Sequence, residues 1–405
     1  MRILCIADEF PLPATNGYRI RLANVVAGLA EAGEVDLFCT VSDRADLTSD
    51  TADLRDAARV SICPRETYRS SLRRVPQWLR SGWPRAVAWR DWSGPRAALQ
   101  AWAKPPYDAV WYSHCHTWLG LHDDALGPAV VDLDNLEDEI MRRFIAMGDD
   151  LDLGTAQQRS WRDRARRQLA FALMRVDIRR WHRLQREAAT RAARTVVCSE
   201  LDRTRLGAGG AVVIPNGYDP APTVPASHSA APEFLMVGLF TYEPNIDGAH
   251  YFAKQVLPLI QRRHPDARAV FVGRHDGALR DLEGRAGVSI AGYVDDLDPL
   301  FATATAIVIP LRSGSGTRIK VLEAFARRLP VVSTTLGCEG IDVHAGHDVL
   351  VADTPAALAY ECTRLVDDPA LAAAVAAAGH DLWQRRYQWS EIRHHIRDLV
   401  TEAAG

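Results

Sequence analysis

The most informative part of the sequence lies in the last third of the chain, where residues 310–325 read PLRSGSGTRIKVLEAF. An apolar strand pattern ends at Pro310, a loop of small residues follows, and an apolar helical pattern begins at Arg318. Small residues let backbone N–H groups approach an anion, and a helix N-terminus adds a favourable dipole. The stretch therefore favours phosphate binding, with Arg318 and Lys320 supplying full positive charge.

The same stretch supplies most of the candidate binding residues. Glu323 follows one turn after the two cations, and the loop before them consists of Gly314, Ser315, Gly316 and Thr317. The alternative is an ordinary loop between a strand and a helix, with a surface arginine and lysine. Lys320 is one of only three lysines in the chain, against 45 arginines, which favours the functional interpretation.

Outward from this stretch, short apolar runs alternate with helical patterns along both halves of the chain. The runs typical of buried strands include 2–8, 35–40, 59–63, 109–113, 129–133 and 195–199, and then 233–238, 267–273 and 306–310. Alternation of this kind favours parallel sheets. A chain of 405 residues also exceeds what one hydrophobic core usually organises. We therefore predict an α/β fold with two Rossmann-like, doubly wound domains that face each other across a cleft.

Composition shifts place the domain boundaries. We expect an N-terminal domain at 1–216, a linker at 217–232 that is rich in Pro, Ala and Ser, and a C-terminal domain at 233–385. Residues 386–405 are predicted to form a helix that packs back toward the N-terminal domain.

Bulk composition excludes several classes of protein. The net charge of −3 argues against a nucleic-acid binder, and no apolar run reaches the ~20 residues that span a bilayer. The seven cysteines are odd in number and scattered, which favours reduced thiols, no disulfide and no zinc site. We expect a cytoplasmic protein.

Arginine is concentrated in residues 155–194, which hold twelve arginines against three acidic residues. Apolar residues recur there at helical spacing while the arginines fill the other faces. A solvated helical face is one interpretation. The other is a surface that contacts anionic lipid at the inner face of the membrane, or a phosphate-bearing acceptor.

Two further loops in the N-terminal half carry candidate residues. Gly17 precedes the first helical pattern, where it is either a turn or a close approach to phosphates. His114 and His116 follow the strand at 109–113, at the carboxyl edge where α/β sheets bind ligands. A metal site at this His-x-His pair lacks a clear carboxylate or thiolate set in the sequence. The acidic run 131–139 suits either acceptor hydroxyls or capping of the next helix, and none of its residues is assigned to catalysis.

The C-terminal half resembles the retaining GT-B glycosyltransferases of family 4, also described as glycosyl transferases group 1. Glu323 matches the second glutamate of their E-x7-E motif, which holds the donor ribose, but Ser315 stands at the first position. The two cations that the family places after the first strand of this lobe are absent from 237–245, and we expect Arg318 and Lys320 to replace them. Further matches lie at 244–247, 271–274, 292–296, 330–334 and 337–341.

The resemblance implies roles for individual residues. It puts Arg274, Tyr293 and Val294 at the nucleotide donor, the last two near the nucleobase. It also implies that His116 contacts the donor sugar near the reacting carbon, although a structural histidine is the alternative. The N-terminal domain would be the acceptor side.

These residues lead to one functional prediction and three alternatives. The chain is expected to transfer a sugar, with retention, from a nucleotide-diphosphate donor to a hydroxyl acceptor, without a metal or other cofactor. One alternative is a nucleotide-sugar epimerase of the same fold. Another is a non-catalytic sugar-nucleotide sensor, which Ser315 favours. A dinucleotide dehydrogenase is disfavoured because neither half shows G-x-G-x-x-G after its first strand.

Overall fold

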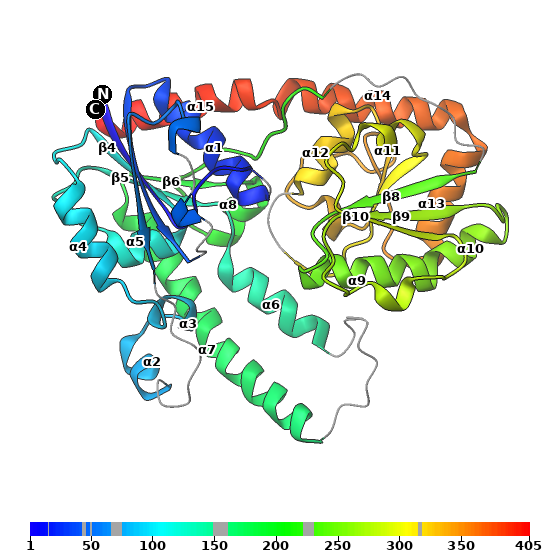
Figure 1. Ribbon diagram of the computed structural model, residues 1–405, viewed down its shortest axis with the longest axis horizontal. Coiled ribbons are helices and arrows are strands. Elements are labelled where there is room, and N and C mark those ends of the chain that lie inside the picture. The colour runs from blue at the N-terminus through cyan, green and yellow to red at the C-terminus, as the bar shows by residue number, and fades with distance from the viewer. Residues whose placement is uncertain are drawn as a thin grey trace. The chain divides into compact units, whose positions relative to one another are not determined.

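The computed structural model describes residues 1–14, 16–42, 46–48, 51–65, 75–148, 161–221, 231–314 and 318–405. The chain divides into two compact units (Figure 1). Unit 1 comprises Met1–Arg142, Ala165–Asn216 and Trp389–Gly405, and unit 2 comprises Arg143–Arg164 and Gly217–Gln388.

Unit 1 is built on a seven-stranded parallel sheet with the order β3-β2-β1-β4-β5-β6-β7. Its central strands are buried along nearly their whole length, as apolar runs without alternation predict. The strands are β1 (Arg2–Ala7), β2 (Glu34–Val41), β3 (Arg59–Pro64), β4 (Ala109–Ser113), β5 (Ala129–Leu133), β6 (Arg194–Val197) and β7 (Ala211–Val213).

Side chains cap the starts of two helices of unit 1. The Asn16 side chain accepts a hydrogen bond from the Arg19 amide at the start of the first helix, and Ser199 caps the eighth. The helices that lie wholly or partly in unit 1 are α1 (Gly17–Ala30), α2 (Val75–Ser81), α3 (Arg85–Ala88), α4 (Ser93–Trp102), α5 (Cys115–Leu121), α6 (Glu137–Met147), α7 (Trp161–Arg191), α8 (Glu200–Leu206) and α15 (Trp389–Ala404).

Helix α15 belongs to unit 1 although it is the last element of the chain. It packs against α1, where a Cβ atom on Gly28 would lie only 3.0 Å from the Cβ atom of Ile396. Buried side chains of α15, including Ile392 and Ile396, join the core under β1 and β2. The chain therefore passes from unit 2 back to unit 1 between Gln388 and Trp389.

Unit 2 contains a six-stranded parallel sheet with the order β10-β9-β8-β11-β12-β13. The strands are β8 (Glu233–Val237), β9 (Arg268–Val272), β10 (Val288–Gly292), β11 (Ala306–Ile309), β12 (Val331–Ser333) and β13 (Leu350–Val351). The helices are α9 (Glu243–Tyr251), α10 (Leu257–Gln261), α11 (Asp298–Thr303), α12 (Ile319–Ala326), α13 (Pro355–Asp367) and α14 (Pro369–Arg386).

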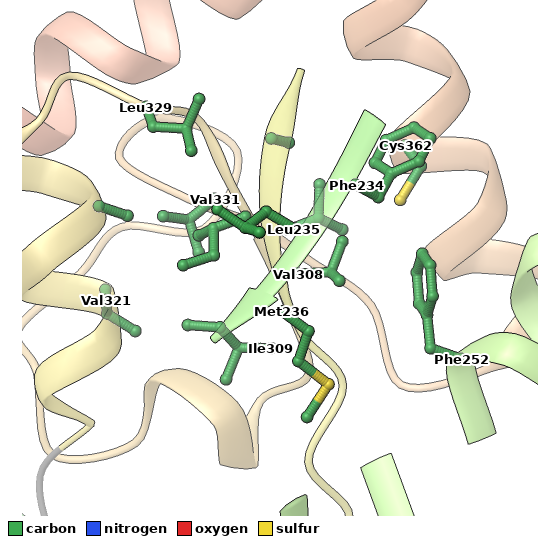
Figure 2. Packing of buried hydrophobic residues seen from close by; sticks show 14 of the residues in the cluster. Phe234, Leu235, Met236, Phe252, Val308, Ile309, Val321, Leu329, Val331 and Cys362 are labelled. Atoms are coloured by element: carbon green, nitrogen blue, oxygen red, sulfur yellow. The ribbon is translucent and has the colours of Figure 1, made fainter. Parts of the chain in front are cut away.

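Helices cover both faces of this second sheet. Figure 2 shows Val321 of α12 on one side of β8 and β11, with Phe252 and Cys362 on the other side. Helix α14 packs against α12, where Gly379 lies against the ring of Phe325. This packing fixes the position of α12, which begins after Arg318 and carries Lys320.

Both sheets reverse their strand order at one point. In unit 1 the chain builds outward from β1 in one direction and from β4 in the other, and in unit 2 it does so from β8 and β11. Ligands of doubly wound folds bind beyond the carboxyl ends of strands at such points. The loops after β1 and β4, and those after β8 and β11, are therefore where the binding chemistry of each unit is expected.

Two elements of unit 2 differ in their bounds from the sequence patterns. The pattern along 247–263 predicts a helix, which in the structure begins earlier, at Glu243, because Pro244 suits a first helical turn. The helix is also interrupted by a π-helical stretch, Phe252–Val256, just before Pro258, a residue that cannot donate an intrahelical hydrogen bond. The pattern along 348–351 predicts a strand, and the strand in the structure is Leu350–Val351.

The arginine-rich segment forms much of α7, and several of its arginines make contacts within unit 1. The Arg180 guanidinium donates to the carbonyl oxygens of Trp78, Leu79 and Trp83. Arg183 donates to the carbonyl of Gly82 in the same way. These arginines join α7 to the α2 region by hydrogen bonds, which helical spacing in the sequence does not reveal. No helix of the described residues is long and apolar enough to cross a membrane.

A glycine substitution tests whether α14 fixes the position of α12. A Cβ atom on Gly379 would lie 2.5 Å from the Phe325 ring, so Gly379→Ala should destabilise unit 2 by about 1–3 kcal/mol. Gly94→Ala in α4 is the control, because a Cβ atom there meets nothing within 4 Å. Denaturant unfolding of the full chain measures both variants, and equal midpoints would contradict the packing argument.

Candidate functional site

Helix α12 begins with positive charge, although negative charge is what stabilises the positive end of a helix dipole. Arg318 occupies the N-cap position, Lys320 is the second helical residue, and the first turn holds no acidic residue. The partial positive charge of a helix N-terminus adds to these two cations. Arg318 is only 9% exposed, so solvent screens its charge poorly. The start of α12 is therefore an electropositive point that favours an anion.

Lys320 reaches from α12 to the loop that follows β8. Its ammonium donates to Asn245 Oδ1 over 2.8 Å, and a Cβ atom on Gly238 would lie 2.3 Å from the Lys320 Nζ atom. Burial, and then the neighbouring Arg318, lower the pKa of Lys320 to about 7. A cation from α12 thus stands beside the segment 237–245, in which the sequence analysis found no cation.

Glu323 accepts a hydrogen bond from Tyr218, a residue that the sequence analysis did not single out. The Tyr218 hydroxyl donates to Glu323 Oε1 over 2.8 Å, and the Arg327 Nε atom lies 3.7 Å from the same oxygen. Burial raises the pKa of the Glu323 carboxyl despite these partners. Tyr218 was assigned to the linker, yet its amide donates to the carbonyl of Tyr387 and its carbonyl accepts from Trp383 Nε1. No local pattern in the sequence signals this connection.

The other predicted donor residues lie at the same edge of the sheet. Arg274 follows β9 and pairs with Asp276 over 3.1 Å, whereas Tyr293 and Val294 follow β10, with Tyr293 70% exposed. Gly314 follows β11 and has a φ of +102°, which favours glycine. Ser315, Gly316 and Thr317 lie outside the described residues.

A second group of ionisable side chains gathers at the reversal point of unit 1. We call Asp8, His114, His116 and Asp134 the His114 cluster. Asp8 follows β1, the two histidines follow β4, and Asp134 follows β5, so three strand ends bring the group together. All four are buried or nearly so. The sequence analysis placed the histidines at this edge but did not connect them with Asp8.

His114 lies between two carboxylates. Its Nδ1 atom is 2.9 Å from Asp8 Oδ1, and its Nε2 atom is 2.8 Å from Asp134 Oδ1. Although burial disfavours its charged form, Asp134 and Asp8 raise the pKa of His114 well above its ordinary value. Both ring nitrogens then carry protons, so His114 is an imidazolium. Its φ of +74° and the stacked ring of Tyr18, 4.1 Å between centroids, mark a tightly constrained position.

The pKa of His116 is shifted in the opposite direction from that of His114. Its Nε2 atom lies 3.6 Å from Asp8 Oδ2, while its Nδ1 atom is buried and has no hydrogen-bond partner within the described part of the chain. Burial and the nearby Arg90 lower the pKa of His116 well below its ordinary value. His116 is therefore neutral at pH 7 and keeps one nitrogen available.

Two further sequence interpretations can be compared with the structure. The sequence analysis found no carboxylate for a metal site at the His-x-His pair, whereas the fold brings Asp8 within reach of both histidines. Gly17 is the exposed first residue of α1, and it does not adopt a positive φ. In the acidic run, Glu137, Asp138 and Glu139 form the first turn of α6, where acids stabilise a helix start.

Comparison with known proteins places these sites in context. Residues 231–368 match the family model of the glycosyl transferases group 1. An uncharacterized 44.6 kDa protein in the cps region of Klebsiella pneumoniae is 23% identical over 128 residues, which span 29% of this chain and 33% of that protein. The chain therefore matches about a third of the length of this relative.

Solved structures resemble the whole chain. Sucrose-phosphate synthase from Thermosynechococcus elongatus is 14% identical over 98% of both chains, with a TM-score of 0.68. HepE from Anabaena, in complex with UDP-glucose, is 14% identical over 99% of both, with a TM-score of 0.61. WaaG, a glycosyltransferase involved in lipopolysaccharide biosynthesis, is 14% identical over 99% of this chain and 100% of WaaG, with a TM-score of 0.62.

These findings confirm two predictions. The α/β fold class with two doubly wound parallel sheets is that of the GT-B structures. The predicted relation of the C-terminal half to the glycosyl transferases group 1 is confirmed by the match over 231–368, which contains Arg318, Lys320 and Glu323.

Removing the Tyr218 hydroxyl tests the contact with Glu323. Tyr218→Phe should lower the free energy of unfolding of unit 2 by about 1–3 kcal/mol, because a buried carboxylate loses its hydrogen-bond donor. Tyr360→Phe is the control, since Tyr360 is 63% exposed. Chemical denaturation of both variants measures the difference, and a Tyr218→Phe chain as stable as the control would remove the contact from the argument.

Proposed function

We propose that this chain, whose residues 231–368 form a glycosyl transferases group 1 domain, transfers a sugar from a nucleotide-diphosphate donor to a hydroxyl acceptor. The proposal includes retention of configuration at the reacting carbon and no requirement for a metal ion. A uridine diphosphate sugar is the first donor to test, because HepE has been solved with UDP-glucose.

The observation that carries the proposal is the charge at the start of α12. Acidic residues stabilise a helix start and cations destabilise it, yet here it holds Arg318 and Lys320. Burial, and then repulsion by Arg318, lower the pKa of Lys320. A diphosphate offers two negatively charged groups that would relieve this repulsion, whereas a neutral ligand would not.

The same charges suit the chemical step. When the bond between the sugar and the diphosphate breaks, negative charge develops on the leaving nucleotide. The acceptor oxygen forms the new bond to the same carbon, and its proton passes to the departing phosphate oxygen. Arg318, protonated Lys320 and the helix dipole would stabilise that charge without reorganising. One preorganised donor of this kind is typically worth on the order of 3 kcal/mol in the barrier. Glu323, held by Tyr218, would bind the donor ribose.

Two alternatives use the same donor site. An epimerase would transform the nucleotide sugar without an acceptor, and a sugar-nucleotide sensor would bind it without turnover. Ser315, which stands where the family has its first glutamate, favours the sensor. The contact of His116 with the donor sugar stays a prediction.

A panel of nucleotide sugars tests the proposal. The true donor should raise the melting temperature, since a ligand at a hundred times its Kd stabilises by about 2.7 kcal/mol. The labelled donor is then incubated with the protein and candidate acceptors, and the products are analysed. A labelled glycoside with the anomeric configuration of the donor is the expected result. A rearranged nucleotide sugar would indicate the epimerase, and binding without any product would indicate the sensor.

The charge state of Lys320 predicts how donor affinity depends on pH. In the free protein its pKa is about 7, and a bound diphosphate would raise that pKa because it stabilises the ammonium. Binding above pH 7 must therefore take up a proton. The affinity for UDP-glucose should be highest below pH 7 and should fall, by up to about tenfold per pH unit, between pH 7 and pH 8.5.

Calorimetry on two variants isolates this effect. Lys320→Met should bind UDP-glucose more weakly and lose most of the pH dependence. Lys254→Met is the matched control, because the Lys254 ammonium pairs with Asp281 over 3.0 Å at another place in unit 2. A Lys320→Met protein with unchanged affinity would remove Lys320 from the donor site.

A further inference from the structure

One carboxylate of the His114 cluster faces three positively charged groups. Asp8 Oδ1 is bound by His114, and its Oδ2 atom lies 3.7 Å from Arg90 Nη1 and 3.9 Å from Arg65 Nη1. These two distances exceed those of hydrogen bonds. Arg65 follows β3 and Arg90 follows α3, so two further elements bring guanidinium groups to the edge already occupied by the histidines.

The two guanidinium groups retain unused donors. Arg65 is 7% exposed and donates to the neutral hydroxyls of Thr40 and Ser42. Its Nε atom, Arg90 Nη1 and His116 Nδ1 are all buried and have no hydrogen-bond partner among the residues that the structure describes. Each buried polar atom without a partner calls for an explanation, and a water, an ion or a ligand that binds there is one.

The two guanidinium groups also act on each other. Both lie within 4 Å of Asp8 Oδ2, and the same carboxylate is already bound by His114. Burial, and then the neighbouring Arg90, lower the pKa of Arg65 to about 10. A bound anion would stabilise both guanidinium groups.

Further described acids near these groups have partners of their own or a raised pKa. Asp132 pairs with Arg21 over 2.9 Å, and Glu9, which acts on Arg65, pairs with Arg19 over 2.7 Å. Burial raises the pKa of Glu137 to about 7, so a large fraction of it is uncharged at neutral pH.

A metal ion is the rival occupant, because Asp8, His114 and His116 offer ligand atoms within 4.8 Å of one another. Both nitrogens of His114, however, already face carboxylates. A divalent cation would also have to approach Arg65 and Arg90, whose charges repel it. The observations therefore favour an anion.

We propose that Arg65, Arg90 and His116 form a binding site for a carboxylate or phosphate group carried by the acceptor substrate. The planar forks of arginine bind both groups well, and the neutral His116 adds one donor. The assignment to the acceptor rests on the proposed function, whereas the anion site itself does not. The predicted donor diphosphate site at α12 is formed by residues of unit 2, and the anion site is formed by residues of unit 1.

Calorimetry on the full chain tests the anion site. Inorganic phosphate and methyl β-D-glucuronide are titrated in the presence of saturating UDP, which occupies the α12 site, and methyl β-D-glucoside serves as the neutral match of the glucuronide. The wild-type protein should bind phosphate and the glucuronide at least about tenfold more tightly than the glucoside. Equal affinity for the two glycosides, or no binding of either anion, would overturn the proposal.

Variants assign the binding to these residues. Arg65→Met and Arg90→Met should each weaken phosphate binding by about tenfold or more. Arg59→Met is the matched control, because Arg59 is the first residue of the strand that Arg65 follows and pairs with Asp36 at the other end of that strand. If Arg65→Met fails to fold, Arg90→Met and the pKa of His116 still decide the question. That pKa, followed by NMR, should rise when phosphate binds and should stay unchanged in Arg90→Met.

The outcomes separate this proposal from the proposed function. Lys320→Met should lose UDP affinity and keep the phosphate site. Phosphate binding that disappears in Lys320→Met but survives in Arg65→Met and Arg90→Met would overturn the anion site and leave the donor site intact. Binding of one Zn²⁺ ion that is lost in His116→Ala would replace the anion by a metal and overturn the proposal as well.

Discussion

Because the strands of each sheet all run in one direction, their carboxyl ends lie along a single edge, and residues distant in sequence meet there. Asp8, His114 and Asp134 come from the ends of three strands of unit 1. In unit 2 the same constraint brings Lys320, at the start of α12, to Gly238 and Asn245 after β8. Both candidate sites depend on this constraint before they depend on any individual contact.

Each site holds like charges close together, at a cost in free energy that apolar packing has to offset. Val321, Leu322 and Phe325 of α12 are fully buried, and burial of such side chains contributes about 1.5–3 kcal/mol each. That contribution offsets the cost of holding Arg318 and Lys320 together at a helix start. In unit 1, the positive φ of His114 and the stacked Tyr18 ring constrain the position of the His114 side chain. Positive charges held in fixed positions favour the binding of an anion.

The two sites differ in how visible they are in the sequence. The α12 site is contiguous, since a strand end, a loop of small residues and two cations follow one another within 310–325. Its partners Asn245 and Tyr218 are not visible, because they are 75 and 105 residues away from the residues they bind. The His114 cluster shows only its His-x-His pair in the sequence, and Arg65 and Arg90 carry no motif at all.

Patterns along the chain indicate the fold class, the run of parallel strands and the helix that carries Lys320 and Glu323 after Arg318, because hydrophobic periodicity and small-residue loops act over a few residues. Which charges meet depends on the tertiary structure. It placed Asp8 between the histidines and the two arginines, engaged Glu323 with Tyr218, and returned α15 to unit 1. The pKa of a buried group depends on neighbours from other strands, and no pattern along the chain records their distances.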